Sequence, residues 1–254
     1  MKTADDIGTN RTGIATSPLE APQVIAGAEE GGATSGGDGS EAAAARAAYV
    51  REAEPIGSVP PPASIKGAIK TVAQALKGEK ASVFVDKLGE RLAFERTGVR
   101  LYALAMLKAE AGPGWEGAPT AADLATIQRD ELEHFGMLQQ CAKDLGADPT
   151  AMTPSADVAA NLSKGIPAVL ADPRTDLRQC LEGLLVAELA DNAGWEVLIS
   201  LARELGQDKM VERFQRALDE EQEHLERVRR WLQMGVLGAA SGAVAEKGEQ
   251  PRAH

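Results

Sequence analysis

Two stretches of this 254-residue chain place a glutamate three residues before a histidine. The first pair is Glu131 with His134, and the second is Glu221 with His224. Both stretches have the pattern of a helix, and residues three apart on a helix project from the same face. In both, that face is otherwise apolar and is expected to be buried. One such pair would be explained by a salt bridge on a helix surface. Two buried pairs need partners, because an uncompensated buried charge is costly.

Four long segments carry apolar residues at helical spacing, and acidic or histidine residues interrupt each stripe at one level. These segments cover about 81–111, 121–145, 174–205 and 208–234. The interrupting residues, called the Glu/His cluster below, are Glu95 in the first segment, Glu131 and His134 in the second, Glu188 in the third, and Glu221 and His224 in the fourth.

The Glu/His cluster has the residue types of a two-metal site. Four carboxylates gathered in a helical bundle would have to take up protons or admit water unless cations neutralised them. Two divalent metal ions would offset most of this charge, and bridging carboxylates can hold such ions roughly 3.5–4 Å apart. A mixture of Glu and His suits iron or manganese and lacks the thiolates of a structural zinc site. Acidic residues off the stripes are expected on the surface; they are Glu90, Glu133, Glu196 and Glu223.

The connections between the four segments predict how the helices are arranged. The loop at 111–120 is rich in Gly and Pro, and LGQD at 205–208 makes a tight turn. Between the second and third helices, residues 146–173 contain four prolines and two glycines, so we expect an irregular connection with at most short helical turns. Short, long and short connections predict an all-α fold, an antiparallel four-helix bundle with a long crossover.

The ends of the chain differ in composition from the bundle. We expect residues 1–63 to be a flexible extension in which 41–54 can form a short helix. Residues 64–78 carry an amphipathic pattern of Ile65, Ile69, Val72 and Leu76, which predicts a short helix that docks on the bundle or on another subunit. The bundle itself would occupy 79–235, followed by a flexible tail at 236–254.

Composition and charge indicate which partners and which cellular compartment to expect. A formal charge of −11 argues against nucleic acid or an anionic membrane surface as the main partner. There is no apolar run of membrane-spanning length and no signal-peptide pattern. Cys141 and Cys180 lack CxxC spacing and fit a reducing compartment, with Cys141 a buried inert thiol. We therefore expect a cytoplasmic protein.

The pattern of Glu on one helix of each hairpin and Glu-x-x-His on the next resembles the ferritin-like superfamily of di-iron carboxylate proteins, particularly bacterioferritins and rubrerythrins. The resemblance covers about 81–234. It implies that Glu131 and Glu221 bridge two metals. The remaining members of the Glu/His cluster would complete the two positions, Glu95 with His134 and Glu188 with His224.

Two further residues gain a role from this resemblance. Tyr102 lies seven residues after Glu95, where the family keeps a tyrosine beside its site, and Trp195 has the same offset from Glu188. Tyr102 would be a hydrogen-bond donor or a redox-active phenol, or else a core aromatic. Asp191 falls where rubrerythrins carry an additional Glu that moves on and off a metal. Because Asp is shorter, a hydrogen bond to a ligand fits it better than direct ligation.

The implied function is an oxidoreductase of ferroxidase or peroxidase type in which two Fe ions react with O2 or H2O2. Leu132 stands where bacterioferritins bind haem through a Met, so no haem is expected. The lack of CxxC leaves no rubredoxin-type iron site, so electrons would come from an external donor. The alternatives are a manganese catalase-like enzyme with two Mn ions, a subunit of an iron-storage shell, and a non-catalytic metal-binding bundle. A homodimer or larger homo-oligomer is expected.

Overall fold

The computed structural model describes residues 22, 26, 39–59 and 79–242, and every regular element in these ranges is an α-helix. The chain divides into two units, 1–54 and 55–254. In the first unit, helix α2 (Ser40–Glu52) lies where the sequence allows a short helix, and none of its residues is buried. The amphipathic segment predicted at 64–78 lies outside the described residues.

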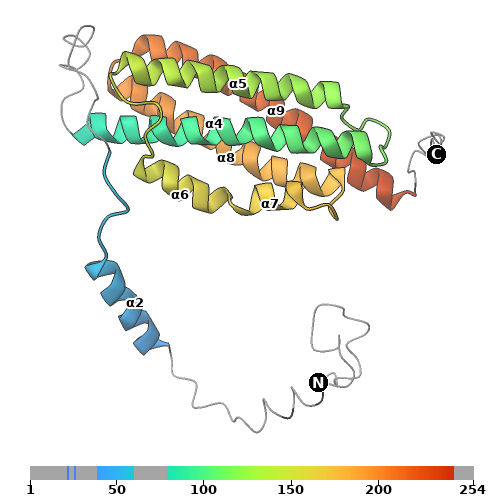
Figure 1. Ribbon diagram of the computed structural model, residues 1–254, viewed down its shortest axis with the longest axis horizontal. Coiled ribbons are helices and arrows are strands. Elements are labelled where there is room, and N and C mark those ends of the chain that lie inside the picture. The colour runs from blue at the N-terminus through green and yellow to red at the C-terminus, as the bar shows by residue number, and fades with distance from the viewer. Residues whose placement is uncertain (1–21, 23–25, 27–38, 60–78, 243–254) are drawn as a thin grey trace. The chain divides into compact units, whose positions relative to one another are not determined.

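Four long helices form the bundle in the second unit, as Figure 1 shows. They are α4 (Glu79–Ala111), α5 (Ala121–Asp144), α8 (Leu177–Glu204) and α9 (Asp208–Ala240). The most extensive contacts join α4 to α5 and α8 to α9, and further contacts of α4 with α8 and of α5 with α9 close the bundle. α5 and α8 run in one direction, and α4 and α9 run in the other (Figure 1). The predicted all-α bundle is confirmed.

Hydrogen-bonded N-terminal caps fix the starts of α5 and α8. At the start of α5, the Thr120 side chain accepts a hydrogen bond from the Asp123 amide, and the Asp123 carboxylate accepts one from the Thr120 amide. The same reciprocal arrangement joins Asp176 and Gln179 at the start of α8. These bonds satisfy amides that have no partner within the helix, and they fix where each helix begins.

The crossover between α5 and α8 contains more helix than predicted. It forms α6 (Pro154–Ser163), which packs on α4, and α7 (Gly165–Ala171), which packs on α8. The expectation of short turns was wrong because Pro154 does not break a helix here. It occupies the first turn, where its missing N–H has no helical partner to lose, and Thr153 caps that turn.

Helix α9 also runs further than predicted. The sequence predicts a flexible tail from residue 236, but residues 236–240 continue α9 to Ala240. Gly235, at the predicted end, is buried within the helix, and a side chain there would collide with the Trp115 ring. It therefore provides space for a close contact.

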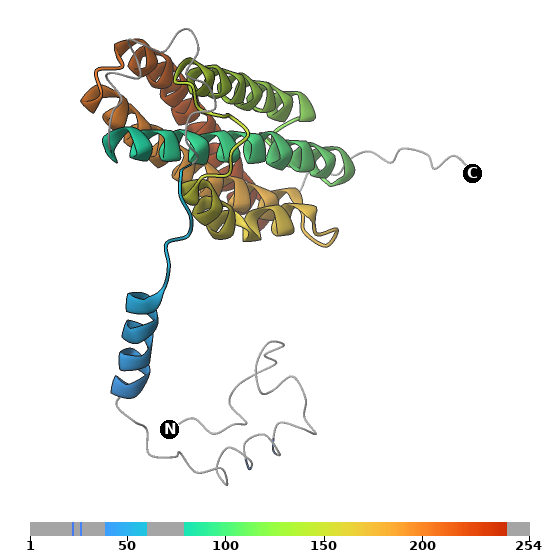
Figure 2. The same cartoon turned by 60° about the vertical axis from the view of Figure 1, so that its left-hand side comes forward.

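Buried apolar residues form two clusters along the bundle. One surrounds Phe84, Leu138 and Phe214, and the other surrounds Leu124 and Leu181. Between them lies a buried polar layer to which all four long helices contribute. Figure 2 shows the helices around this interior from a second direction. None of the described helices has the length and apolarity needed to span a membrane.

Candidate metal centre

The structure buries all six residues of the Glu/His cluster in the polar layer of the bundle. Each of them is at most 4 % exposed. The stripe pattern placed them on inward faces because helical periodicity fixes which residues share a face. Of the four acidic residues expected on the surface, Glu133, Glu196 and Glu223 are exposed, whereas Glu90 is partly buried and pairs with Lys87. The predicted convergence of the six residues is therefore present, and metal ligation by them stays a prediction.

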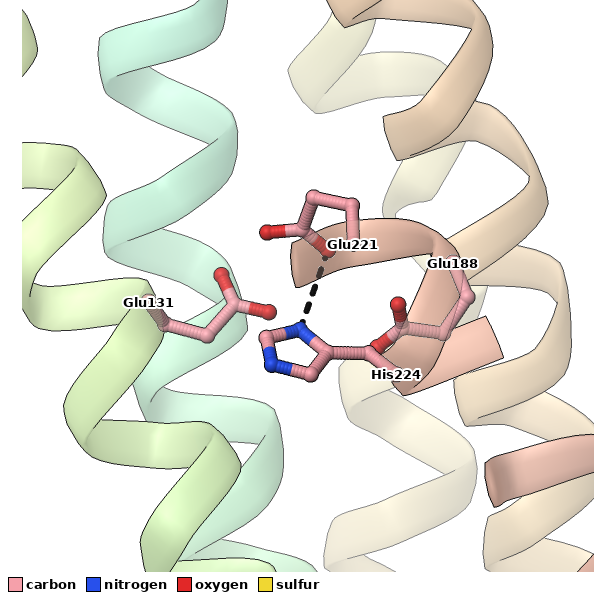
Figure 3. Close-up of side chains that lie close together, drawn as sticks. All are labelled: Glu131, Glu188, Glu221 and His224. Atoms are coloured by element: carbon pink, nitrogen blue, oxygen red, sulfur yellow. Dashed lines mark hydrogen bonds and ion pairs between the residues drawn. The ribbon is translucent and has the colours of Figure 1, made fainter. Parts of the chain in front are cut away.

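Within the polar layer, potential ligand atoms gather into three overlapping groups, each with its atoms within 4.8 Å of one another. Glu221 belongs to all three groups. The groups consist of Glu131, Glu188, Glu221 and His224; of Glu95, His134 and Glu221; and of Glu95, Glu131, Asp191 and Glu221. Figure 3 shows the first group, in which Glu131 reaches from α5 toward the α8 and α9 side chains.

Two donors on α4 each hold one oxygen of a glutamate. An Arg91 nitrogen donates to Oε1 of Glu95 at 2.5 Å, and the Tyr102 hydroxyl donates to Oε1 of Glu188. The other oxygen, Oε2, of both glutamates is buried and has no hydrogen-bond partner among the described residues. The same is true of Oε2 of Glu131. Buried carboxylate oxygens without a donor are costly unless a cation neutralises them, so this donor set fits metal ions.

The two histidines each present Nδ1 to the cluster. Nδ1 of His134 lies 2.8 Å from Oε1 of Glu221, and Nδ1 of His224 lies 3.2 Å from Oε2 of the same residue. The outer nitrogen of each ring contacts a carboxylate from the opposite hairpin. Nε2 of His134 is 2.7 Å from Glu220, and Nε2 of His224 is 3.2 Å from Asp130. Such outer contacts orient an imidazole and raise its basicity as a ligand.

Burial and mutual repulsion shift the proton affinities of the cluster. Burial, followed by the charge of Glu221, raises the pKa of Glu131 and of Glu188 well above the usual range. Burial also acts to raise the pKa of Glu221, but the contacts of its carboxylate with His134 and His224 outweigh burial and lower that pKa to about 2. For His134, burial acts to lower the pKa, but Glu221 and Glu95 raise it to about 11. Without metal, the cluster therefore retains protons, and cations can replace them.

One glycine makes room for the cluster. Gly98 is buried on α4, and a Cβ at this position would overlap the Glu131 carboxylate. A larger residue would displace this carboxylate from the interior. The glycine therefore permits the close approach of α4 and α5 at the level of the cluster.

The other predicted site residues have definite positions. Tyr102 is 1 % exposed and bonded to Glu188, which agrees with the expected hydrogen-bond donor. Burial, followed by the charge of Glu188, raises the pKa of Tyr102, so its phenol stays protonated. Asp191 is 1 % exposed and pairs with Arg91. Cys141 is buried, whereas Leu132 is 55 % exposed.

Three residues beside the cluster were not predicted from the sequence. Arg91 lies one turn before Glu95 on α4, and a charged residue at that spacing on an inward face is the sequence signal for its role. Asp130 and Glu220 each immediately precede the glutamate of a Glu-x-x-His pair. The repeated acid-Glu-x-x-His pattern is visible in the sequence. However, each of these acids contacts the histidine of the opposite hairpin, and that pairing depends on how the helices pack.

Comparison with known proteins identifies the family. A model of the ferritin-like domain matches residues 85–235, which make up more than half of the chain. The chain therefore belongs to the ferritin-like family, as its resemblance predicted. Neither the curated proteins nor the solved structures include a match. Its fold and its buried carboxylate and histidine residues define a bundle that can hold metal.

Proposed function

We propose that this protein is an oxidoreductase in which the Glu/His cluster binds two iron ions that react with O2 or H2O2, in ferroxidase or peroxidase fashion. The observation that carries the proposal is the convergence of carboxylate oxygens and imidazole nitrogens from four helices in one buried layer. Each of the four glutamates presents an oxygen that has no hydrogen-bond partner in the described part of the chain.

The overlap of the ligand groups supports bridging roles for two glutamates. Glu221 shares one group with Glu95 and His134 and another with Glu188 and His224. Glu131 likewise shares groups with Glu95 and with Glu188. Glu131 and Glu221 would therefore bridge the two ions. One ion would be completed by Glu95 and His134, and the other by Glu188 and His224.

The burial of the cluster supports a reaction with a small molecule. Its residues are at most 4 % exposed, so O2 or H2O2 fits this interior better than a bulky organic substrate. Bound iron would supply the electrons that reduce the oxidant, and an external donor would restore them. The chain itself holds the ligands in place, excludes bulk water with its two apolar clusters, and keeps the Tyr102 proton on the phenol beside Glu188.

The first test is the metal content of natively expressed protein, measured by mass spectrometry. The proposal expects about two iron ions per chain. Two manganese ions with evolution of O2 from H2O2 would instead support the catalase-like alternative, because these ligand types suit both metals. Many irons per chain in a very large particle, seen by light scattering, would support a storage shell.

The second test is oxidant consumption after anaerobic loading with Fe(II), using a matched pair of variants. Glu131→Gln removes a buried carboxylate, whereas Glu133→Gln makes the same chemical change at an exposed position two residues away. We expect Glu131→Gln to lose one or both irons and to consume O2 and H2O2 at least about tenfold more slowly. Glu133→Gln should behave as the unaltered protein. Equal behaviour of the two variants would contradict the proposal, and so would the absence of bound metal.

A further inference from the structure

Arg91 is a buried cation at the edge of the Glu/His cluster, and it is 3 % exposed. Its guanidinium contacts two carboxylates, Glu95 on its own helix at 2.5 Å and Asp191 on α8. It also lies over two rings, 4.7 Å from the centroid of Phe94 and 5.3 Å from that of Trp195. Planar guanidinium groups favour this combination of ionic contacts and ring stacking.

The facing helix provides space for this side chain. A Cβ at Gly194 on α8 would lie 2.5 Å from a guanidinium nitrogen of Arg91. Asp191, Gly194 and Trp195 thus form a seat for the guanidinium on one face of α8. The two hairpins resemble each other in sequence, but the arginine–aspartate pair has no second copy at the equivalent positions. Asp191 lies three residues after Glu188, and Gly98 is the residue three after Glu95. Four residues before Glu188, where Arg91 would have its counterpart, the chain has Leu184.

Charge explains why a cation is needed there. The polar layer buries five carboxylates, because Asp191 joins the four glutamates of the Glu/His cluster. Two divalent metal ions neutralise four of these charges, and Arg91 supplies the fifth positive charge. Asp191 also belongs to the third group of potential ligand atoms, with Glu95, Glu131 and Glu221. The guanidinium therefore contacts two of the four carboxylates that would otherwise be able to hold another cation.

We propose that Arg91 is a resident cation that takes the place of a third metal ion and limits this centre to two. Asp191 holds the guanidinium, and the guanidinium holds Oε1 of Glu95, so that Oε2, which has no hydrogen-bond partner among the described residues, would remain for a metal ion. Arg91 is thus a positioning residue, and Asp191 acts on it and does not ligate metal. This inference rests on the proposed function only in taking the Glu/His cluster to bind two divalent ions.

Anaerobic titration with Co(II), followed by calorimetry and visible absorption, tests the inference without turnover. The unaltered protein should bind two Co(II) per chain. Arg91→Met frees Asp191 and Glu95, and this variant should bind a third Co(II). The double variant Arg91→Met with Asp191→Asn removes both charges and should return to two. Arg96→Met is the matched control, because Arg96 lies on the same helix with an exposed side chain and should leave the count at two.

Asp191→Asn alone tests the opposite case, in which the positive charge of Arg91 stays and one of its two carboxylate partners is lost. Arg91 then has only Glu95 as a partner and competes with metal for it, so binding of the second Co(II) should weaken at least tenfold. In the metal-free protein, this variant should lower the thermal midpoint by roughly 10 °C, because it leaves a buried charge with part of its partner lost. The double variant should recover part of that loss, since removing both members of a buried pair is far less damaging.

The outcomes separate this inference from the proposed function. No Co(II) bound by the unaltered protein would contradict the proposed function. Two Co(II) bound by both the unaltered protein and Arg91→Met, with equal affinity, would overturn only the role of Arg91. If Arg91→Met does not fold, Asp191→Asn and the double variant decide. Unchanged Co(II) affinity in Asp191→Asn, or a double variant no better than Asp191→Asn, would overturn the inference.

Discussion

Two residues on α4 each hold one oxygen of a cluster glutamate. Arg91 and Tyr102 each hold Oε1 of one glutamate, Glu95 in the first case and Glu188 in the second, and leave Oε2 of that residue facing the interior. One donor is a cation and the other a neutral phenol, so the two ends of the centre differ in charge. Two metal ions at these ends would therefore differ in affinity even though their ligand types match.

Gly98→Ala tests how closely the ligands are packed. The added methyl group would overlap the Glu131 carboxylate, so we expect Co(II) affinity to fall at least about tenfold while the helical content is retained. Gly136→Ala on α5 is the control, because a Cβ at this position would meet nothing within 4 Å beyond its chain neighbours and the backbone of its own helix. It should bind Co(II) normally and gain about 0.5–1 kcal/mol of stability from helix propensity. Equal Co(II) affinity in the two variants would show that Glu131 does not need this space.

Helical periodicity alone is enough to place the four cluster glutamates inside the bundle. Glu95, Glu131, Glu188 and Glu221 interrupt apolar stripes, and a helix with an apolar stripe has only one face to bury. The roles of Arg91, Asp130 and Glu220 could not be obtained in this way. Their partners lie on other helices or depend on rotamers, and these are set by how the helices pack against one another.

At the scale of elements, caps and loops fix the level at which each helix presents its residues of the Glu/His cluster. The Thr120–Asp123 pair and the three-residue turn at 205–207 were foreseeable from local residue types. The two helices of the crossover were not. Proline at the first turn of a helix and proline in a loop look alike in a sequence. What distinguishes Pro154 is that α6 packs on α4, and this is a long-range contact.

Thr120→Ala tests the cap of α5 apart from the metal site. The Thr120 hydroxyl accepts a hydrogen bond from the Asp123 amide at 3.1 Å, and its loss should lower the free energy of unfolding by about 1 kcal/mol. Denaturant unfolding would measure this change, and the count of bound Co(II) should stay at two. Thr126→Ala on the same helix is the control, because Thr126 bonds only its own helix and should change stability by less than about 0.5 kcal/mol. A Thr120→Ala variant as stable as this control would show that the cap does not stabilise α5.

For the whole molecule, the buried cluster couples folding to pH. In the metal-free bundle, Glu131, Glu188 and His134 have raised pKa values, so they carry protons that the unfolded chain releases. His134 has a pKa of about 11 when folded, against an ordinary value of 6.5. Its contribution to stability is complete below pH 6.5 and is lost as the pH rises toward 11. The lowered pKa of Glu221, about 2, acts in the opposite direction only in acid.

Between pH 7 and 9 the folded metal-free protein therefore binds more protons than the unfolded chain. We expect its free energy of unfolding to fall by about 1.4 kcal/mol per pH unit for each extra proton. Denaturant unfolding at pH 7, 8 and 9 measures this slope. His134→Gln removes the side chain that carries one of these protons, so the slope should become shallower by about 1.4 kcal/mol per pH unit. Metal ions displace the same protons, so Co(II) affinity should rise over this range. Metal-free stability that stays constant or increases from pH 7 to 9 would show that the cluster is not protonated as its geometry implies.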